Sequence, residues 1–220
     1  MTKEKLARMI DHTALKIETS RADIEKLCEE ARRYHFISVA INPVNVALAA
    51  KLLKGTDVKV DAGIGFFLGA YPIDFKVFEV KDVIEKGAEE LDMVMNVAAF
   101  KSGNYDLVRR EMEAFAEAAG DKVTKVILET AFLTDEEKIK ACEIAKEAGV
   151  KFVKTSTGFG PSGATIHDVK LMRKTVGPDV GVKASGGIRT TEDALAMIEA
   201  GANRLGTSSG VKIIKGLEES

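Results

Sequence analysis

The chain has 220 residues, of which 45% are hydrophobic and 30% charged, so it can bury a substantial core without a disulfide or a metal. Its 32 basic and 34 acidic residues leave a net charge of -2 with no block of one sign, which argues against nucleic acid or membrane partners. Cys28 and Cys142 lie in helical patterns, and neither a metal-ligand cluster nor an apolar N-terminal segment is present, so we expect a reduced cytoplasmic protein without a dedicated metal site.

Short apolar segments alternate with amphipathic segments along the whole chain. The apolar segments have the length of buried strands and fall at residues 10–13, 38–42, 59–64, 90–96, 123–129, 151–154, 180–184 and 204–207. The amphipathic segments have helical spacing and fall at residues 20–34, 43–53, 74–86, 104–118, 134–148, 165–175, 191–200 and from 208 onward, with a short additional helix at 2–9. This alternation predicts a (β/α)8 TIM barrel with a short extra N-terminal helix, forming one domain over residues 1–220; a doubly wound open sheet is the alternative.

Two lysines occupy positions where the strand pattern predicts an apolar side chain. Lys154 lies at or near the end of one strand, and Lys183 lies in another; each is followed by small hydroxyl residues and glycine. A lysine ammonium close to a second ammonium loses its proton more readily, and the free amine is a nucleophile toward carbonyls. Either lysine could act on the other in this way. The alternative is that both extend into solvent at a sheet edge, as most lysines do.

Other polar residues of the strands could join these lysines in one site. In a barrel, the carboxyl ends of all strands open on one face. The residues expected there are Asp11, Asn42, Asp92, Asn96, Lys125, Glu129, Lys154 and Lys183. Asp92 and Lys125 lie within apolar strands, where an unpaired charge is costly, so each should have a partner of opposite charge. Interior ion pairs without a chemical role are the alternative interpretation.

Two loops near the end of the chain are rich in glycine and serine. Gly186-Gly187-Ile188-Arg189 follows the seventh strand, and Gly206-Thr207-Ser208-Ser209-Gly210 follows or ends the eighth. Backbone N–H groups and hydroxyls at these two adjacent loops hold phosphate in many barrels. Glycines that serve only to make tight turns are the alternative.

Five motifs together resemble one known family. They are Asp11-His12-Thr13, Leu91-Asp92-Met93-Val94, the segment Val153–Phe159, the segment Val182–Arg189 and the segment Gly206–Gly210. In this order, and over essentially the whole chain, they resemble the deoxyribose-phosphate aldolases. The resemblance implies that Lys154 forms a Schiff base, that Lys183 adjusts the proton affinity of Lys154, and that Asp92 transfers protons with a water. Lys125 and Asp11 would lie behind Asp92.

The same resemblance implies the reaction and its partners. The expected activity is the reversible cleavage of 2-deoxy-D-ribose 5-phosphate to D-glyceraldehyde 3-phosphate and acetaldehyde, in the cytoplasm, without a cofactor or a metal, by a homodimer or homotetramer. The partners are small phosphorylated sugars and aldehydes, with no nucleic acid and no membrane. The residues expected to bind substrate or its phosphate are Thr157, Gly158, Gly186, Gly187, Gly206, Ser208 and Ser209.

The third strand and the loop after it depart from the family pattern. Ala62, Gly63 and Phe67 stand where threonine, valine and proline are usual, and the segment 71–75 is atypical. Positions often held by cysteine or glycine also differ, at Ala40, Val44, Asp61 and Ala98. We expect the lysine chemistry to be retained and the range of acceptor aldehydes to change. Two other functions stay open: an iminium-forming carboligase with a shifted acceptor range, and a phosphate-ligand-binding barrel without catalysis.

Overall fold

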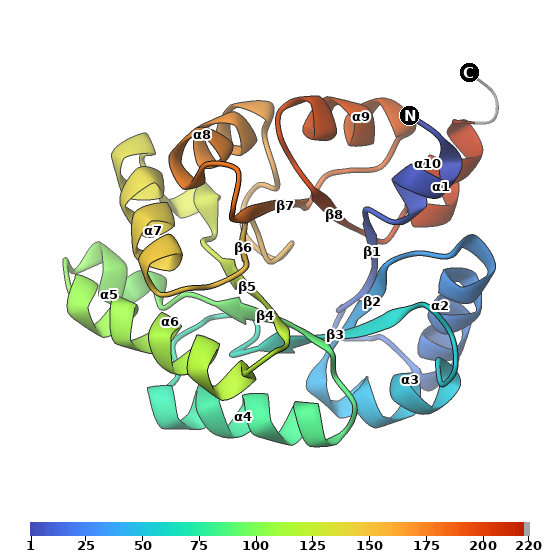
Figure 1. Ribbon diagram of the computed structural model, residues 1–220, viewed down its shortest axis with the longest axis horizontal. Helices are drawn as coiled ribbons and strands as arrows, with labels where there is room; N and C mark the ends of the chain where they lie inside the picture. The colour runs from blue at the N-terminus through green and yellow to red at the C-terminus, as the bar shows by residue number, and fades with distance from the viewer. Residues whose placement is uncertain (218–220) are drawn as a thin grey trace.

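The strands of the computed structural model, which describes residues 1–217, close into a parallel barrel in sequential order, with β8 hydrogen-bonded to β1 (Figure 1). The strands are β1 (Ile10–Ala14), β2 (Ser38–Ile41), β3 (Lys59–Ile64), β4 (Glu90–Val94), β5 (Val123–Ile127), β6 (Phe152–Lys154), β7 (Gly181–Ser185) and β8 (Arg204–Thr207). The predicted (β/α)8 barrel is confirmed, and the open sheet is not found.

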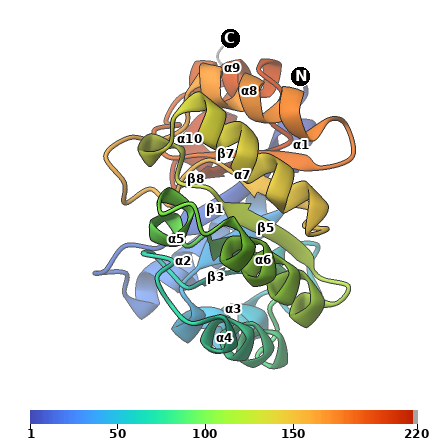
Figure 2. The same ribbon diagram turned by 90° about the vertical axis from the view of Figure 1, so that its left-hand side faces the viewer.

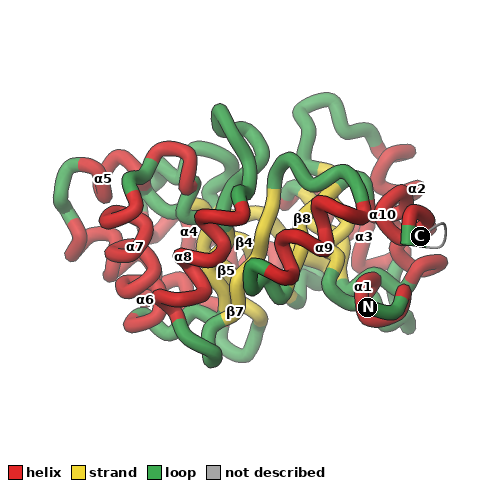
Figure 3. Tube along the Cα trace, turned by 90° about the horizontal axis from the view of Figure 1, so that it is seen from above, coloured by secondary structure: helices red, strands yellow, loops and turns green. Residues whose placement is uncertain are grey.

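Helices cover the outside of this barrel, as the side view and the view from above both show (Figures 2 and 3). They are α1 (Lys3–Ala7), α2 (Arg21–Tyr34), α3 (Val46–Leu52), α4 (Ile73–Glu85), α5 (Val97–Lys101), α6 (Tyr105–Ala119), α7 (Asp135–Glu147), α8 (Ile166–Val176), α9 (Thr191–Glu199) and α10 (Gly210–Gly216), with 3-10 turns at Pro43–Asn45 and Thr130–Phe132. The short N-terminal helix α1 packs beside α10. Among the described residues, none of the helices is long and apolar enough to cross a membrane.

Side-chain capping fixes where several helices begin. The hydroxyl of Ser20 accepts the backbone N–H of Asp23, whose carboxylate accepts the N–H of Ser20 in return. The same reciprocal pattern starts α7 at Thr134 and α9 at Thr190. These reciprocal hydrogen bonds form capping boxes, which satisfy N–H groups that have no partner inside the helix. They therefore fix the residue at which each helix begins and the preceding loop ends.

Two predicted strands extend two residues beyond the observed ends. β4 ends at Val94 because the side chain of Asn96 accepts the N–H of Ala99 and starts α5, a helix that the sequence pattern did not predict. β5 ends at Ile127, and Glu129 has a left-handed backbone with φ of 56° that a strand cannot continue through. The expectation that Asn96 and Glu129 end strands was therefore wrong.

Side-chain alternation along the strands separates two buried regions. On β4, Leu91 and Met93 belong to the apolar core between the strands and the helices, whereas Glu90 and Asp92 lie on the opposite face, inside the barrel. The register places Asp92 beside Lys125 of β5 and Lys154 beside Lys183 of β7. The barrel interior is therefore charged, and its surround is apolar.

Candidate active site

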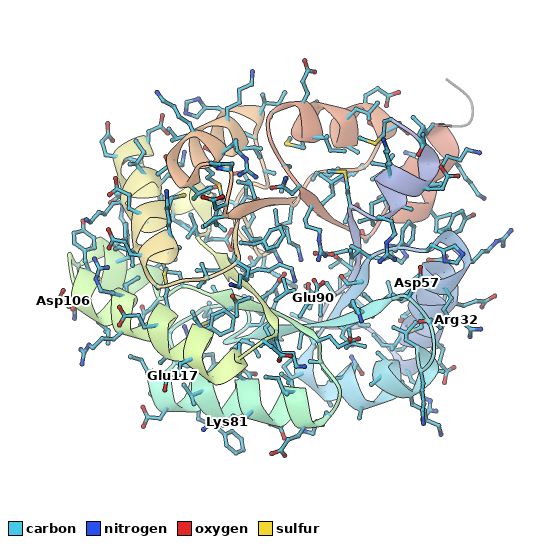
Figure 4. All side chains as sticks on the ribbon, in the orientation of Figure 1. Arg32, Asp57, Lys81, Glu90, Asp106 and Glu117 are labelled. Atoms are coloured by element: carbon cyan, nitrogen blue, oxygen red, sulfur yellow. The ribbon has the colours of Figure 1, made fainter. Side chains whose placement is uncertain are left out.

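Eight charged side chains fill the interior of the barrel. The carboxylates are Asp11, Asp61, Glu90 and Asp92, and the cations are Lys125, Lys154, Lys183 and Arg204; none is more than 6% exposed. Figure 4 shows Glu90 in the centre of the molecule, whereas Lys81, Asp106 and Glu117 lie on the outer helices. Charges buried this deeply need partners of opposite sign, and each of these eight has one within 4 Å.

Asp92 is the carboxylate that links the lysines. Its Oδ2 accepts hydrogen bonds from Lys154 Nζ at 2.6 Å and from Lys183 Nζ at 2.7 Å, and its Oδ1 lies 3.0 Å from Lys125 Nζ. Burial alone would raise the pKa of Asp92, but Lys125, Lys154 and Lys183 outweigh it and hold that pKa well below the ordinary value. Asp92 is thus an ionised carboxylate in contact with three lysine ammonium groups.

The pKa values of Lys154 and Lys183 are shifted in opposite directions. Burial lowers the pKa of Lys154; Asp92 opposes this and the neighbouring Lys183 adds to it, and the net direction is downward. Lys183 lies 2.5 Å from Asp11, 3.0 Å from Asp61 and 2.7 Å from Asp92, and these carboxylates raise its pKa in spite of burial. Lys183 therefore holds its proton more strongly than Lys154 does. Proximity to Lys183 is a smaller influence on Lys154 than burial.

Three members of the charged network were not predicted from the sequence to belong to the site: Asp61, Glu90 and Arg204. Arg204 binds Asp11 and also donates to Glu90 Oε1 at 2.6 Å. Lys125 Nζ lies 2.8 Å from Glu90 and 3.0 Å from Asp61. The sequence signal for Glu90 was its position two residues before Asp92, which places both side chains on the same face of a strand. The signal for Asp61 was a charged residue between the apolar residues Val60 and Ala62.

A pocket of about 660 Å³ opens beside the strand ends. All seven residues predicted to bind substrate or phosphate line it: Thr157, Gly158, Gly186, Gly187, Gly206, Ser208 and Ser209. Lys16 and Arg189 add positive charge to its lining, and Glu18 and Asp23 add negative charge. Gly206 also has a steric role, because a Cβ there would lie 3.2 Å from Lys183 Cε and 2.9 Å from Ser185 Cβ. The pocket and the charged interior therefore meet at Gly206.

Three residues predicted to belong to the charged cluster have other contacts. Asn42 donates to the carbonyl of Leu15 at 3.2 Å, and Asn96 caps α5. Glu129 accepts the N–H of Thr157 at 3.1 Å and its hydroxyl at 2.5 Å. Glu129 therefore orders the loop that lines the pocket, and the grouping of these three with the lysines was wrong.

An aromatic stack stands at one side of the pocket. Phe67 stacks on Phe159 with ring centroids 4.6 Å apart, and Phe66 meets the edge of the same ring at 6.0 Å. Phe159 lines the pocket. A Cβ at Gly63 would lie 3.0 Å from the ring of Phe66, so this glycine makes room for the stack. The departures at Gly63 and Phe67 thus act on one apolar wall.

Two groups of side chains in the described part of the chain have oxygen or nitrogen atoms close enough to share a cation. They are Asp135, His167 and Asp168, and Asp11, Asp61 and Glu90. Lys138 donates to Asp135 at 3.1 Å and to Asp168 at 2.6 Å, so the first group already binds an ammonium. Lys125, Lys183 and Arg204 supply positive charge to the second. We assign a metal to neither, and the expectation of a metal-free site stays a prediction.

Comparison with known proteins identifies the chain as an aldolase. The model of the DeoC/LacD family aldolases matches residues 5–216, and the chain belongs to this family of aldolases. Its relatives include the deoxyribose-phosphate aldolase of Streptococcus sanguinis, 62% identical over 216 residues and 98% of both chains, and that of Thermoanaerobacter pseudethanolicus, 62% identical over 211 residues, 94% of this chain and 95% of the relative. A solved deoxyribose phosphate aldolase from Aeropyrum pernix, described as tetrameric, has a TM-score of 0.93 and 35% identity, covering 99% of this chain and 92% of its own.

Proposed function

We propose that the chain is a class I aldolase that reversibly cleaves 2-deoxy-D-ribose 5-phosphate to D-glyceraldehyde 3-phosphate and acetaldehyde through a Schiff base on Lys154. The observation that carries this proposal is the 2.6 Å contact between the buried Lys154 ammonium, whose pKa is lowered, and the ionised Asp92. Membership of an aldolase family, with relatives named deoxyribose-phosphate aldolase at about 60% identity, supports it. It does not favour a carboligase or a non-catalytic barrel.

The reaction begins at the Lys154 amine. The neutral amine attacks the substrate aldehyde carbon, and the carbinolamine that forms loses water to give an iminium. Asp92, acting through a water, accepts the proton of the substrate hydroxyl two carbons away. The carbon–carbon bond then breaks, its electron pair neutralises the iminium to an enamine, and D-glyceraldehyde 3-phosphate leaves. Protonation of the enamine carbon and addition of water release acetaldehyde and restore the amine.

The other charged residues of the network hold Lys154 and Asp92 in place. Lys183 and Lys125 keep Asp92 ionised, and Asp11 holds Lys183 at 2.5 Å. The pocket lined by Gly186, Gly187, Gly206, Ser208 and Ser209 would take the phosphate by backbone N–H and hydroxyl donors. Thr157 and Gly158 lie in the loop after Lys154 and would contact the sugar between Lys154 and the phosphate.

The proposal also extends to cofactors, assembly and location. The lysine supplies the electron sink that many enzymes take from a cofactor, so no cofactor or metal is required. We propose a cytoplasmic homodimer or homotetramer with residues 1–220 as one barrel domain; the tetrameric Aeropyrum pernix relative supports the assembly. The closure of the barrel by β1 and β8 supports the single domain.

Covalent trapping tests the proposal. Acetaldehyde and borohydride should add one ethyl group to the protein, and peptide mapping should place it on Lys154. Cleavage of 2-deoxy-D-ribose 5-phosphate should be measured on the same preparation. Labelling without cleavage would support the carboligase alternative, and phosphate binding with neither labelling nor cleavage would support the non-catalytic barrel.

A further inference from the structure

Asp61 is a buried carboxylate to which the proposed reaction assigns no step. It lies on β3 and is 1% exposed. Its Oδ2 lies 3.0 Å from Lys125 Nζ and 3.0 Å from Lys183 Nζ, whereas its Oδ1 has no hydrogen-bond partner among the described residues. A carboxylate in this position adds a negative charge to the catalytic network.

The charges of the network balance only while Lys154 is protonated. Four carboxylates then face four cations inside the barrel. Attack on an aldehyde requires the neutral amine of Lys154, which leaves four carboxylates against three cations. An uncompensated charge in a buried site is costly, so the neutral amine is favoured when one carboxylate takes up a proton.

Asp61 is suited to take up that proton. Burial and the neighbouring Asp92 raise the pKa of Asp61 to about 6. The pKa values of Asp11 and Asp92 are lowered in spite of burial, because Lys183 and Arg204 act on the first and Lys125 and Lys154 on the second. Glu90 is bound by both Lys125 and Arg204. Asp61 also has an oxygen, Oδ1, that no side chain of the network binds.

We propose that Asp61 is a positioning residue that controls the charge of Lys154: the ionised carboxylate keeps Lys154 as an ammonium, and protonation of Asp61 favours the free amine. This inference rests on the proposed function of Lys154. The charged groups that face Asp61 come from six other strands and are Asp11, Glu90, Asp92, Lys125, Lys154, Lys183 and Arg204. The ionised Asp61 is one of the influences that raise the pKa of Lys154, against the larger effect of burial.

The proposal predicts a window in pH. Replacing Asp61 by asparagine removes a negative charge and should lower the pKa of Lys154 by about one unit, the scale of one nearby charge in a buried site. Between the pKa of Asp61 and that of Lys154, the variant should therefore hold about tenfold more free amine than the parent. Below this window the parent Asp61 is itself protonated, and above it Lys154 is neutral in both proteins, so the parent and the variant should converge on either side.

The experiment is the initial rate of acetaldehyde trapping at Lys154 as a function of pH. The parent, Asp61→Asn and Asp11→Asn are labelled with acetaldehyde and cyanoborohydride and compared as ratios to the parent at each pH. Asp11→Asn is the matched control, because Asp11 contacts Lys183 but is not among the leading influences on the pKa of Lys154. Within the pH window we expect Asp61→Asn to be trapped about tenfold faster than the parent, and we expect a smaller increase for Asp11→Asn. A ratio for Asp61→Asn that is constant with pH, or a shift to higher pH, would overturn the proposal.

A reciprocal measurement keeps the inference testable if Asp61→Asn does not fold. Coupling between two sites acts equally in both directions. Removing the ammonium with Lys154→Met should raise the pKa of the Asp61 carboxyl, followed by carbon-13 NMR, by about one unit. An unchanged Asp61 titration in Lys154→Met would overturn the link between the two residues. Failure of the parent to be labelled at Lys154 would instead overturn the proposed function, and the NMR titration would still decide the coupling.

Discussion

Lys154 and Lys183 donate to the same oxygen atom, Oδ2 of Asp92, at 2.6 and 2.7 Å. Two ammonium groups on one oxygen repel each other, and the carboxylate between them reduces that repulsion. The two lysines differ in proton affinity, because three carboxylates raise the pKa of Lys183 whereas burial is the main cause that lowers the pKa of Lys154. One lysine can thus act as nucleophile while the other stays charged.

Replacing the nucleophile should abolish cleavage without unfolding the barrel. In Lys154→Arg the guanidinium keeps a cation next to Asp92, but it stays protonated and cannot attack a carbonyl. We expect kcat/KM to fall by at least about a thousandfold, as for other nucleophile substitutions. Lys151→Arg, the same change at an exposed lysine three residues earlier, is the control and should have parental activity. Activity of Lys154→Arg within tenfold of the parent would exclude Lys154 as the nucleophile.

Removing Lys183 should produce a loss of activity that depends on pH. In Lys183→Leu, the charges of Asp11, Asp61 and Asp92 are less compensated, and the pKa of Lys154 rises. Less free amine is then present at neutral pH, so the loss in kcat/KM should shrink as the assay pH is raised.

A buried lysine outside the site supplies the control for that experiment. Lys138 pairs with Asp168 between α7 and α8, so Lys138→Leu should lower stability without changing the shape of the pH profile. A loss in Lys183→Leu that is the same at every pH would show that Lys183 only positions its neighbours.

The barrel could be predicted from the sequence because its repeating strand–helix unit is local. The lysines and Asp92 could be predicted because each interrupts an apolar strand. Arg204 could not, since it is the first residue of a strand, where a charge is ordinary, and only closure of the barrel brings it to Glu90. The helix α5 was missed because apolar residues continue past Val94, and only the cap formed by Asn96 separates strand from helix.

The raised pKa of Asp61 predicts an unusual dependence of stability on pH. An unfolded aspartate has a pKa of about 3.9, and the folded value here is about 6. Between these values the folded state binds more protons than the unfolded state, so Asp61 contributes stability at low pH that is lost as pH rises through this range.

Urea unfolding of Asp61→Asn measures this contribution. The stability of the variant relative to the parent should rise by about 2 to 3 kcal/mol between pH 4 and pH 6, the linkage energy of a shift of about two units. Asp11→Asn should behave in the opposite sense, because the folded pKa of Asp11 is lowered and its stabilisation is lost as pH falls below about 4. A difference between Asp61→Asn and the parent that does not change with pH would show that Asp61 has an ordinary pKa.

The aromatic wall should set which acceptor aldehydes are used in the synthetic direction. Phe67 stacks on Phe159, which lines the pocket, whereas the glycine loops that would hold phosphate are at the ends of β7 and β8. Phe67→Ala should therefore lower kcat/KM for apolar acceptors relative to phosphorylated ones by roughly tenfold, the scale of one or two methylene groups of pocket contact. Restoring the usual residues together, with Ala62→Thr, Gly63→Val and Phe67→Pro, should change the ratio in the same direction, since a side chain at position 63 would displace Phe66.

Two controls separate this wall from the lysine chemistry. Phe78→Ala removes an exposed phenylalanine of α4 that does not line the pocket, and it should leave the acceptor ratio unchanged. Trapping of acetaldehyde at Lys154 should be nearly the same in the parent, Phe67→Ala and the triple variant, and inorganic phosphate should compete only with phosphorylated acceptors. If the triple variant keeps the parental acceptor ratio but alters trapping at Lys154, the loop after β3 acts on the lysine and the two halves of the site are not independent.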